Sequence, residues 1–205
     1  MRRRAEPAAG ADERLRRWLA ALLATPGLTA VRDPDEAWRV HVLESLAAAD
    51  AVASRDGPIV DVGSGGGAPG IPLAAAFPDR EVTLLEASAR KCAFLRRWLP
   101  EFPNLRIVEG RAEEQPVDAS GVAVAKALAP PPVAAEWCLP LVRPGGAAIL
   151  FVGPSADAKA VERAAACVGG GCVEMMPGLF VLPKLAPTPP GFPRRAGVAR
   201  KRPLA

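Results

Sequence analysis

A glycine-rich loop behind a short apolar segment constrains the fold of this chain more than any other feature. An apolar strand is expected over residues 58–63, a loop that is mostly glycine follows, and a helix is expected over 70–77. Glycine lets the backbone adopt positive φ and lets a ligand approach main-chain atoms closely. Strand, glycine loop and helix in this order are typical of the ligand-binding end of an open α/β sheet, although such a loop taken alone is a weak signal.

Strand-like and helix-like segments alternate along the rest of the chain. Strands are expected over 58–63, 81–86, 105–109, 122–125 and 147–152, a terminal hairpin over 172–176 and 179–183, and helices over 70–77, 88–99, 133–141 and 156–168. The segment 143–146, Arg-Pro-Gly-Gly, is expected to form a turn. The alternation predicts a Rossmann-like α/β fold, with a mostly parallel seven-stranded sheet and helices on both faces.

Two flanking segments differ from this core. Residues 12–24 show helical apolar spacing, and a second helix is expected from Pro34, with Asp33 as its N-cap, to about residue 53. From residue 186 the chain is rich in proline and basic, so we expect an extended tail rather than a regular helix. The predicted organisation is an N-terminal helical extension (1–57) packed on the core, a Rossmann-like core (58–185) and a basic tail (186–205).

Composition narrows the class of protein. The 205 residues carry a net charge of +4, with basic runs at Arg2–Arg4 and near the end of the chain. Basic ends suit a polyanion such as RNA, although solvation of the termini explains them equally well. No membrane span or secretory signal is recognisable, so we expect a cytoplasmic protein and, further, a monomer. One histidine and four cysteines without a C-x-x-C pair predict neither a metal site nor a disulfide framework.

Acidic residues around the loop indicate which ligand binds. Asp61 precedes the glycines, and a carboxylate there can hold the amino group of a methionine moiety, whereas nicotinamide-binding loops usually lack an acid at this point. Glu86 ends the second strand, where a carboxylate can accept both ribose hydroxyls or, alternatively, stabilise a helix start. Ala112 and Glu113 follow the third strand, where their main-chain groups can hold adenine or, equally well by spacing, the charged segment can start a helix. Together these residues predict S-adenosylmethionine; a nicotinamide-dependent oxidoreductase is a distant alternative.

These segments, taken together, resemble the bacterial 16S rRNA guanine-N7 methyltransferase family (RsmG, also called GidB). The resemblance runs in order from residue 28 onward, through 28–34 (LTAVRDP), 41–46 (HVLESL), 60–73 (VDVGSGGGAPGIPL), 90–95 (RKCAFL), 110–114 (GRAEE), and 193–197 (PRRAG) with Pro203-Leu204. The second half of the segment 60–73 is much more specific than its glycines.

The resemblance implies transfer of a methyl group to N7 of one guanine in 16S rRNA of the 30S subunit. It implies cofactor contacts at Gly63, Ala68, Ala112, Glu113 and Lys126. With the loop and the acids, the expected cofactor-binding set is Asp61, Gly63, Gly65, Gly67, Ala68, Glu86, Ala112, Glu113 and Lys126. Arg32, Arg194 and Arg195 are the expected RNA-binding residues. Lys126 and His41 are candidates for positioning rather than for chemistry.

Four positions depart from the family pattern. Val40 replaces an arginine, Glu44 an aspartate, Lys126 an arginine and Val152 a lysine. Three functions therefore stay open: the rRNA methyltransferase, a methyltransferase of this fold with another RNA or a small-molecule substrate, and a non-catalytic homologue that binds the cofactor or RNA.

Guanine N7 already carries a lone pair, so its methylation needs no base, and catalysis can consist mostly of placement. Several residues keep two interpretations. His41 either touches the substrate or joins the N-terminal helix to the core, and Lys126 is either functional or an ordinary strand-end lysine. The tail either grips rRNA phosphates or folds back over the sheet with Phe192 as its anchor.

Overall fold

A seven-stranded sheet forms the centre of the computed structural model, which describes residues 11–205; Arg2–Arg4 lie outside the described residues. The strand order is β3-β2-β1-β4-β5-β7-β6. β1 to β5 are parallel, and β7 runs antiparallel to both β5 and β6. The strands are β1 (Ile59–Val62), β2 (Val82–Glu86), β3 (Leu105–Glu109), β4 (Ser120–Lys126), β5 (Val142–Phe151), β6 (Glu174–Met176) and β7 (Leu179–Pro183). The predicted fold class is confirmed.

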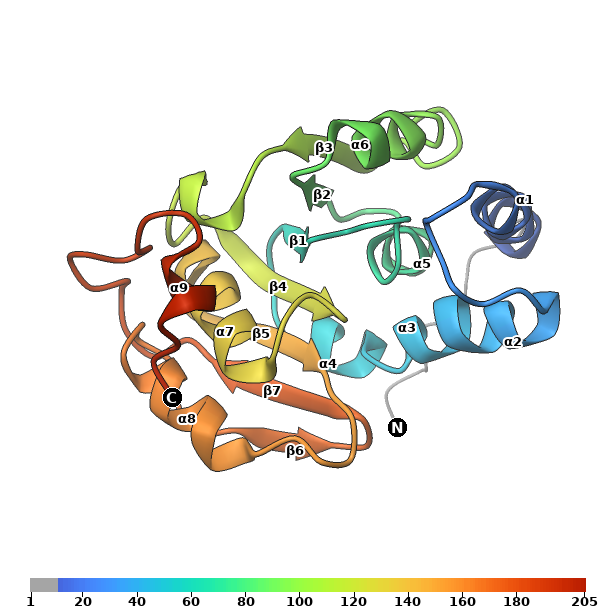
Figure 1. Cartoon of the computed structure of the whole chain (residues 1–205). Helices are drawn as coiled ribbons and strands as arrows, with labels where there is room; N and C mark the ends of the chain where they lie inside the picture. Colours follow the sequence, from blue (N-terminus) through green and yellow to red (C-terminus); the bar gives the residue numbers. More distant parts are fainter. Residues whose placement is uncertain (1–10) are drawn as a thin grey trace.

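Helices cover both faces of this sheet (Figure 1). They are α1 (Ala11–Ala24), α2 (Pro34–Trp38), α3 (Glu44–Leu46), α4 (Ala49–Ala53), α5 (Gly70–Ala76), α6 (Ala89–Arg96), α7 (Pro131–Cys138), α8 (Ala158–Ala166) and α9 (Val198–Lys201), with a π-helical turn η1 (Arg39–Leu43) and 3-10 turns η2 (Ala112–Glu114) and η3 (Leu139–Leu141). No helix in this described part of the chain has the length and apolar character that a bilayer crossing requires.

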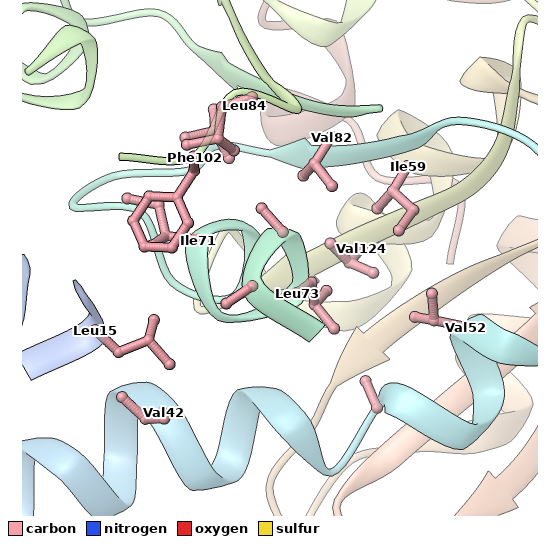
Figure 2. Close-up of a cluster of buried hydrophobic side chains, with 14 of the residues drawn as sticks. Leu15, Val42, Val52, Ile59, Ile71, Leu73, Val82, Leu84, Phe102 and Val124 are labelled. Atoms are coloured by element: carbon pink, nitrogen blue, oxygen red, sulfur yellow. The ribbon is translucent and has the colours of Figure 1, made fainter. Parts of the chain in front are cut away.

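Alternate strand residues supply two separate hydrophobic clusters, as the period-two geometry of a strand requires. Ile59 of β1 belongs to the cluster beneath the N-terminal helices, whereas Val60 belongs to the cluster beneath α7 and α8. In Figure 2, α5 lies between the strands and the N-terminal helices, and its Ile71 and Leu73 contribute to the first cluster together with Leu15 of α1. The N-terminal helices therefore share a core with the sheet.

The second N-terminal helix begins as predicted but is not continuous. The Asp33 side chain accepts a hydrogen bond from the Glu36 N–H at 2.8 Å and caps α2. The helix then passes through η1, and the Ser45 hydroxyl donates to the His41 carbonyl at 2.8 Å. Lys126 of β4 donates to the Val40 carbonyl from outside the helix. A π-helical turn is a local distortion of this kind, and such turns are frequent at functional sites.

The turn expected at residues 143–146 is a bulge inside a longer strand. β5 begins at Val142, which pairs with Ser120, but the next paired residue on β5 is Ala147, opposite Val122. Gly145 takes φ +85°, which glycine adopts without strain. Gly146 has no room for a side chain, because a Cβ there would lie 2.2 Å from the Gly121 carbonyl oxygen. These residues therefore interrupt the pairing as a turn would, but the chain then continues along the same strand.

The tail folds back against the core, and the expectation that it contains no regular helix was wrong. Phe192 packs against the cluster beneath α7 and α8, as the folded-back alternative predicts. Lys184, fully buried, bonds the Thr188 hydroxyl at 2.7 Å and lies 3.2 Å from the Asp118 carboxylate. Beyond the prolines the chain forms α9, which the proline content alone does not predict. Partners on the core, which the local sequence does not contain, fix the path of the tail.

Candidate active site

Two residues in the first half of the glycine loop adopt a left-handed backbone conformation that glycine takes without strain. Gly63 takes φ +72° and Gly65 φ +57°. The N–H groups of Gly63 and Ser64 both donate to the Leu85 carbonyl, at 2.8 and 3.1 Å. A Cβ at position 63 would lie 2.4 Å from a methyl carbon of Leu128, in the loop after β4. Gly63 therefore allows the loops after β1 and β4 to meet closely.

The second half of the loop turns away toward the N-terminal helices. The indole N–H of Trp18 donates to the Gly66 carbonyl at 2.9 Å. A Cβ on Gly67 would lie 3.2 Å from the Trp18 indole nitrogen, and Ala68 packs against the first hydrophobic cluster. Gly67 and Ala68, both predicted to bind cofactor, thus face the protein interior. In the structure these two residues pack the loop against α1 and the first hydrophobic cluster.

A cleft of about 310 Å³ lies at the carboxyl ends of β1 to β4. Four residues of the predicted cofactor-binding set line this cleft: Gly63, Glu86, Ala112 and Glu113. Asp61, Gly65, Gly67, Ala68 and Lys126 do not line it. The position agrees with the rule that ligands of open α/β sheets bind beyond the carboxyl ends of the strands.

Glu86 connects the glycine loop to the start of α6 at the wall of the cleft. Its side chain is 9% exposed, and its two carboxylate oxygens accept hydrogen bonds from the Gly65 N–H at 2.9 Å and the Ser88 N–H at 2.8 Å. Lys91 places its ammonium 3.9 Å away. The Ser88 bond lies at the start of α6, as the helix-start interpretation predicts. Each carboxylate oxygen still has a second lone pair, so Glu86 can also accept from a hydroxyl in the cleft.

Asp61 is buried directly behind the loop, at 1% exposure. One carboxylate oxygen accepts from the Gly70 N–H at 3.0 Å, whereas the other has no hydrogen-bond partner among the described residues. Burial raises the pKa of Asp61 to about 7, and the Gly70 hydrogen bond only partly offsets this effect. An unsatisfied buried acceptor is costly, so this oxygen is a place for a donor from a ligand or a water molecule.

A second cavity, of about 580 Å³, adjoins the cleft at Ala127, a residue that lines both. Its other lining residues include Glu44, Lys126, Phe151 and Val152. Ala127 takes φ +53°, unusual for alanine and strained without support from its surroundings. Lys126 thus lines the second cavity rather than the first cleft, where its predicted role would place it.

Three of the four departures from the family pattern contact one another. The Lys126 ammonium lies 3.0 Å from the Glu44 carboxylate, and it also donates to the Val40 carbonyl. A lysine reaches less far than an arginine, and a glutamate reaches further than an aspartate. The two substitutions therefore compensate each other in length.

His41 lies outside both cavities. Its Nε2 is 2.8 Å from the Thr29 hydroxyl, which also accepts from the Val31 N–H. Burial, followed by the nearby Lys126 charge, lowers the pKa of His41, so the neutral ring is favoured. This bond joins η1 to the segment before α2, both within the N-terminal helical region, and it does not test whether His41 touches the substrate.

The three predicted RNA-binding arginines differ in their surroundings. Arg32 and Arg195 are exposed. Arg194 instead forms two hydrogen bonds of 2.5 Å to the Glu136 carboxylate, which is 2% exposed, and these bonds raise the pKa of Arg194. The prediction that Arg194 binds RNA is corrected: its guanidinium holds the tail to α7, and this bidentate geometry suits such a pair.

Sequence reasoning missed several residues of the cleft. Leu128, Trp137, Lys91 and Arg200 all line it. The Trp137 indole nitrogen is buried with no hydrogen-bond partner in the described part of the chain. Arg200 comes from α9, whose position depends on distant contacts, so no local pattern could have indicated it.

Comparisons with known proteins agree with this geometry. The family described as "GidB: rRNA small subunit methyltransferase G" matches residues 13–179. Two relatives are named ribosomal RNA small subunit methyltransferase G. The protein from Moorella thermoacetica is 36% identical, over 86% of this chain and 82% of its own length; that from Salinispora arenicola is 40% identical, over 76% and 71%.

Solved structures show the same fold at low sequence identity. A TehB-like SAM-dependent methyltransferase from Corynebacterium glutamicum is 19% identical, with a TM-score of 0.55 over 86% of this chain and 98% of that one. The antibiotic-resistance methyltransferase Kmr is 18% identical, with a TM-score of 0.50 over 68% and 92%. With the matches in sequence, which cover most of its length, these findings show that the chain belongs to the GidB family of rRNA small subunit methyltransferases G.

Proposed function

We propose that this protein transfers the methyl group of S-adenosylmethionine to N7 of a specific guanine in 16S rRNA of the small ribosomal subunit. The observation that carries the proposal is the junction of two cavities at Ala127. A methyl donor in the cleft and a base in the second cavity would meet there. This is the arrangement that a direct methyl transfer between two bound molecules requires.

The residues of the cleft fit this cofactor. Glu86 can accept the ribose hydroxyls, and Ala112 and Glu113 offer main-chain groups to the adenine. The unpartnered oxygen of Asp61 can accept from the amino group of the methionine part, through a water if the distance requires it. S-adenosylmethionine supplies an electrophilic methyl group on its sulfonium. The loop around Gly63 brings main-chain atoms within close reach of such a ligand.

The second cavity suits a purine base. Phe151 offers an aromatic face, and aromatic faces stack with unpaired bases. Lys126 lies beside it, with its ammonium 5.6 Å from the Phe151 ring, and can donate to an acceptor on the base edge or to a phosphate. Because N7 is a lone-pair nucleophile, these side chains need only orient the base and exclude water.

Exposed arginines provide a surface for the rest of the RNA. We assign Arg32 and Arg195 to phosphate contacts, which would make RNA binding weaken as the salt concentration rises.

Action on ribosomal RNA also implies a place in the cytoplasm. His41 and the Lys126–Glu44 pair then position the wall of the substrate cavity without joining the chemistry.

The test uses 30S subunits from a strain that lacks this guanine modification. The protein and methyl-labelled S-adenosylmethionine are added, and label is mapped by cleavage at 7-methylguanine. We expect label at one guanine, a large loss with Glu86→Ala, and no loss with the exposed control Glu174→Ala. Label on another RNA or on a small molecule would replace the proposed substrate. Cofactor binding without any transfer would favour a non-catalytic homologue.

A further inference from the structure

Residues 192–202, here called the strap, bring Arg200 to the lining of the cofactor cleft. The strap is held on one side by α7, next to which Figure 1 shows α9. Arg194 forms its bidentate pair with Glu136 of α7 and also donates to the Arg202 carbonyl at 2.9 Å. Ala199 of α9 is 2% exposed. An ion pair to a buried carboxylate and the buried Ala199 side chain fix the strap on this side.

A second attachment lies at η2, a turn that also contacts α7. The Gly197 N–H donates to the Glu113 carboxylate at 3.0 Å. Glu113 belongs to η2, the turn after β3, and itself lines the cleft. The strap therefore bridges α7 and η2, the two elements that border the end of the cleft assigned to adenine.

Arg200 follows Gly197 by three residues and lines the same end of the cleft as Ala112, Glu113 and Trp137. Its side chain is exposed. A planar, permanently charged guanidinium thus stands at the mouth of a cleft whose proposed occupant carries an aromatic ring. Guanidinium groups stack on aromatic faces and are attracted by them, which an ammonium group does less well.

We propose that the strap is part of the cofactor site and that Arg200 binds the adenine ring of S-adenosylmethionine. This inference rests on the proposed function, because it takes the same ligand in the same cleft. It changes the role of the tail: removal of the strap lowers cofactor affinity directly, rather than only the affinity for RNA. Arg200 is a binding residue in this proposal and takes no part in methyl transfer.

Calorimetric titration of the full-length protein tests the proposal with three ligands. S-adenosylmethionine and S-adenosylhomocysteine contain the whole cofactor skeleton, whereas methylthioadenosine keeps the adenosine part and lacks the amino acid. We expect Arg200→Ala to weaken all three about 3-fold to 10-fold, the range of a cation–π contact. Arg200→Lys should give an intermediate loss. Lys201→Ala, at the next position of α9 and outside the cleft lining, should leave all three affinities unchanged.

Two results would overturn the inference. One is unchanged affinity of Arg200→Ala for the three ligands. The other is a loss confined to the two ligands that contain the amino acid, because Arg200 would then act at the methionine end. Thermal unfolding of Arg200→Ala should match that of the unaltered protein, since the side chain is exposed. Failure of the unaltered protein to bind any of the three ligands would overturn the proposed function and this inference with it.

Discussion

The ion pair between Lys126 and Glu44 predicts that these two positions tolerate a joint change better than either single change. The ammonium and carboxylate are 3.0 Å apart, and the side chains are 15% and 41% exposed. Glu44→Asp withdraws the carboxylate by one methylene, which opens the contact to about 4.5 Å, beyond hydrogen-bond range. Lys126→Arg alone crowds the Val40 carbonyl that the ammonium already contacts. Together the two changes restore a pair of similar total length.

The magnitude follows from distance and exposure. Unit charges 3.0 Å apart attract by about 1.4 kcal/mol in water and by several times more in a protein interior. Because water reaches the Glu44 side chain and two side chains must be held in place, we expect a coupling energy of about 1 kcal/mol.

A double-mutant cycle measures this coupling by urea unfolding of the four proteins. Each single variant should lose about 0.7 kcal/mol and the double variant about 0.4 kcal/mol, which is about 1 kcal/mol less than the sum of the two single losses. The same cycle on the exposed pair Arg17–Glu13, with Arg17→Lys and Glu13→Asp, serves as control and should give about 0.3 kcal/mol. Strict additivity of the Lys126 and Glu44 changes would refute the reasoning, because it would mean that the pair contributes no mutual stabilisation.

Three further predictions concern the loop and the tail. Because the pKa of Asp61 is about 7 and its ionised form is the better acceptor of an amino group, S-adenosylmethionine should bind about tenfold more weakly at pH 6 than at pH 8. Asp61→Asn should remove that pH dependence in calorimetry. If the pH dependence persisted in this variant, the Asp61 carboxyl would not be its source. Gly63→Ala should destabilise more than Gly65→Ala by about 1–3 kcal/mol in urea, since both have positive φ but only position 63 lacks room for a Cβ; equal losses would contradict this. Arg194→Ala should cost about 3–5 kcal/mol of unfolding free energy because it strands the buried Glu136 carboxylate, and a loss below about 1 kcal/mol would show that the pair is dispensable.

Features encoded over a few neighbouring residues could be predicted from the sequence. The alternation of apolar strands and helices indicates the sheet, because each strand must bury both faces. The loop at Gly63 and the cap at Asp33 depend on the chemistry of single residues within short segments. Glu86 and Ala112 line the cleft because they end the second strand and follow the third, which topology alone requires.

Features that depend on distant partners could not be predicted. Lys126 and Glu44 form a pair although 82 positions separate them in the sequence, and Arg194 and Glu136 are separated by 58. In both cases the local sequence shows a basic residue and gives no sign of the carboxylate that binds it. The strap combines several such contacts, so the sequence around Arg200 shows only a basic segment. The π-helical turn at Arg39–Leu43 likewise involves a contact from another element, Lys126 of β4.

The late position of α9 along the chain has a consequence for biosynthesis. A ribosome makes every strand of the sheet before it makes Arg200, and domains begin to fold as they emerge. In a nascent chain the sheet would therefore be complete while one border of the cleft is still missing. Cofactor capture would then be postponed until α9 has emerged, and a product terminated before Arg200 would compete poorly for the cell's S-adenosylmethionine.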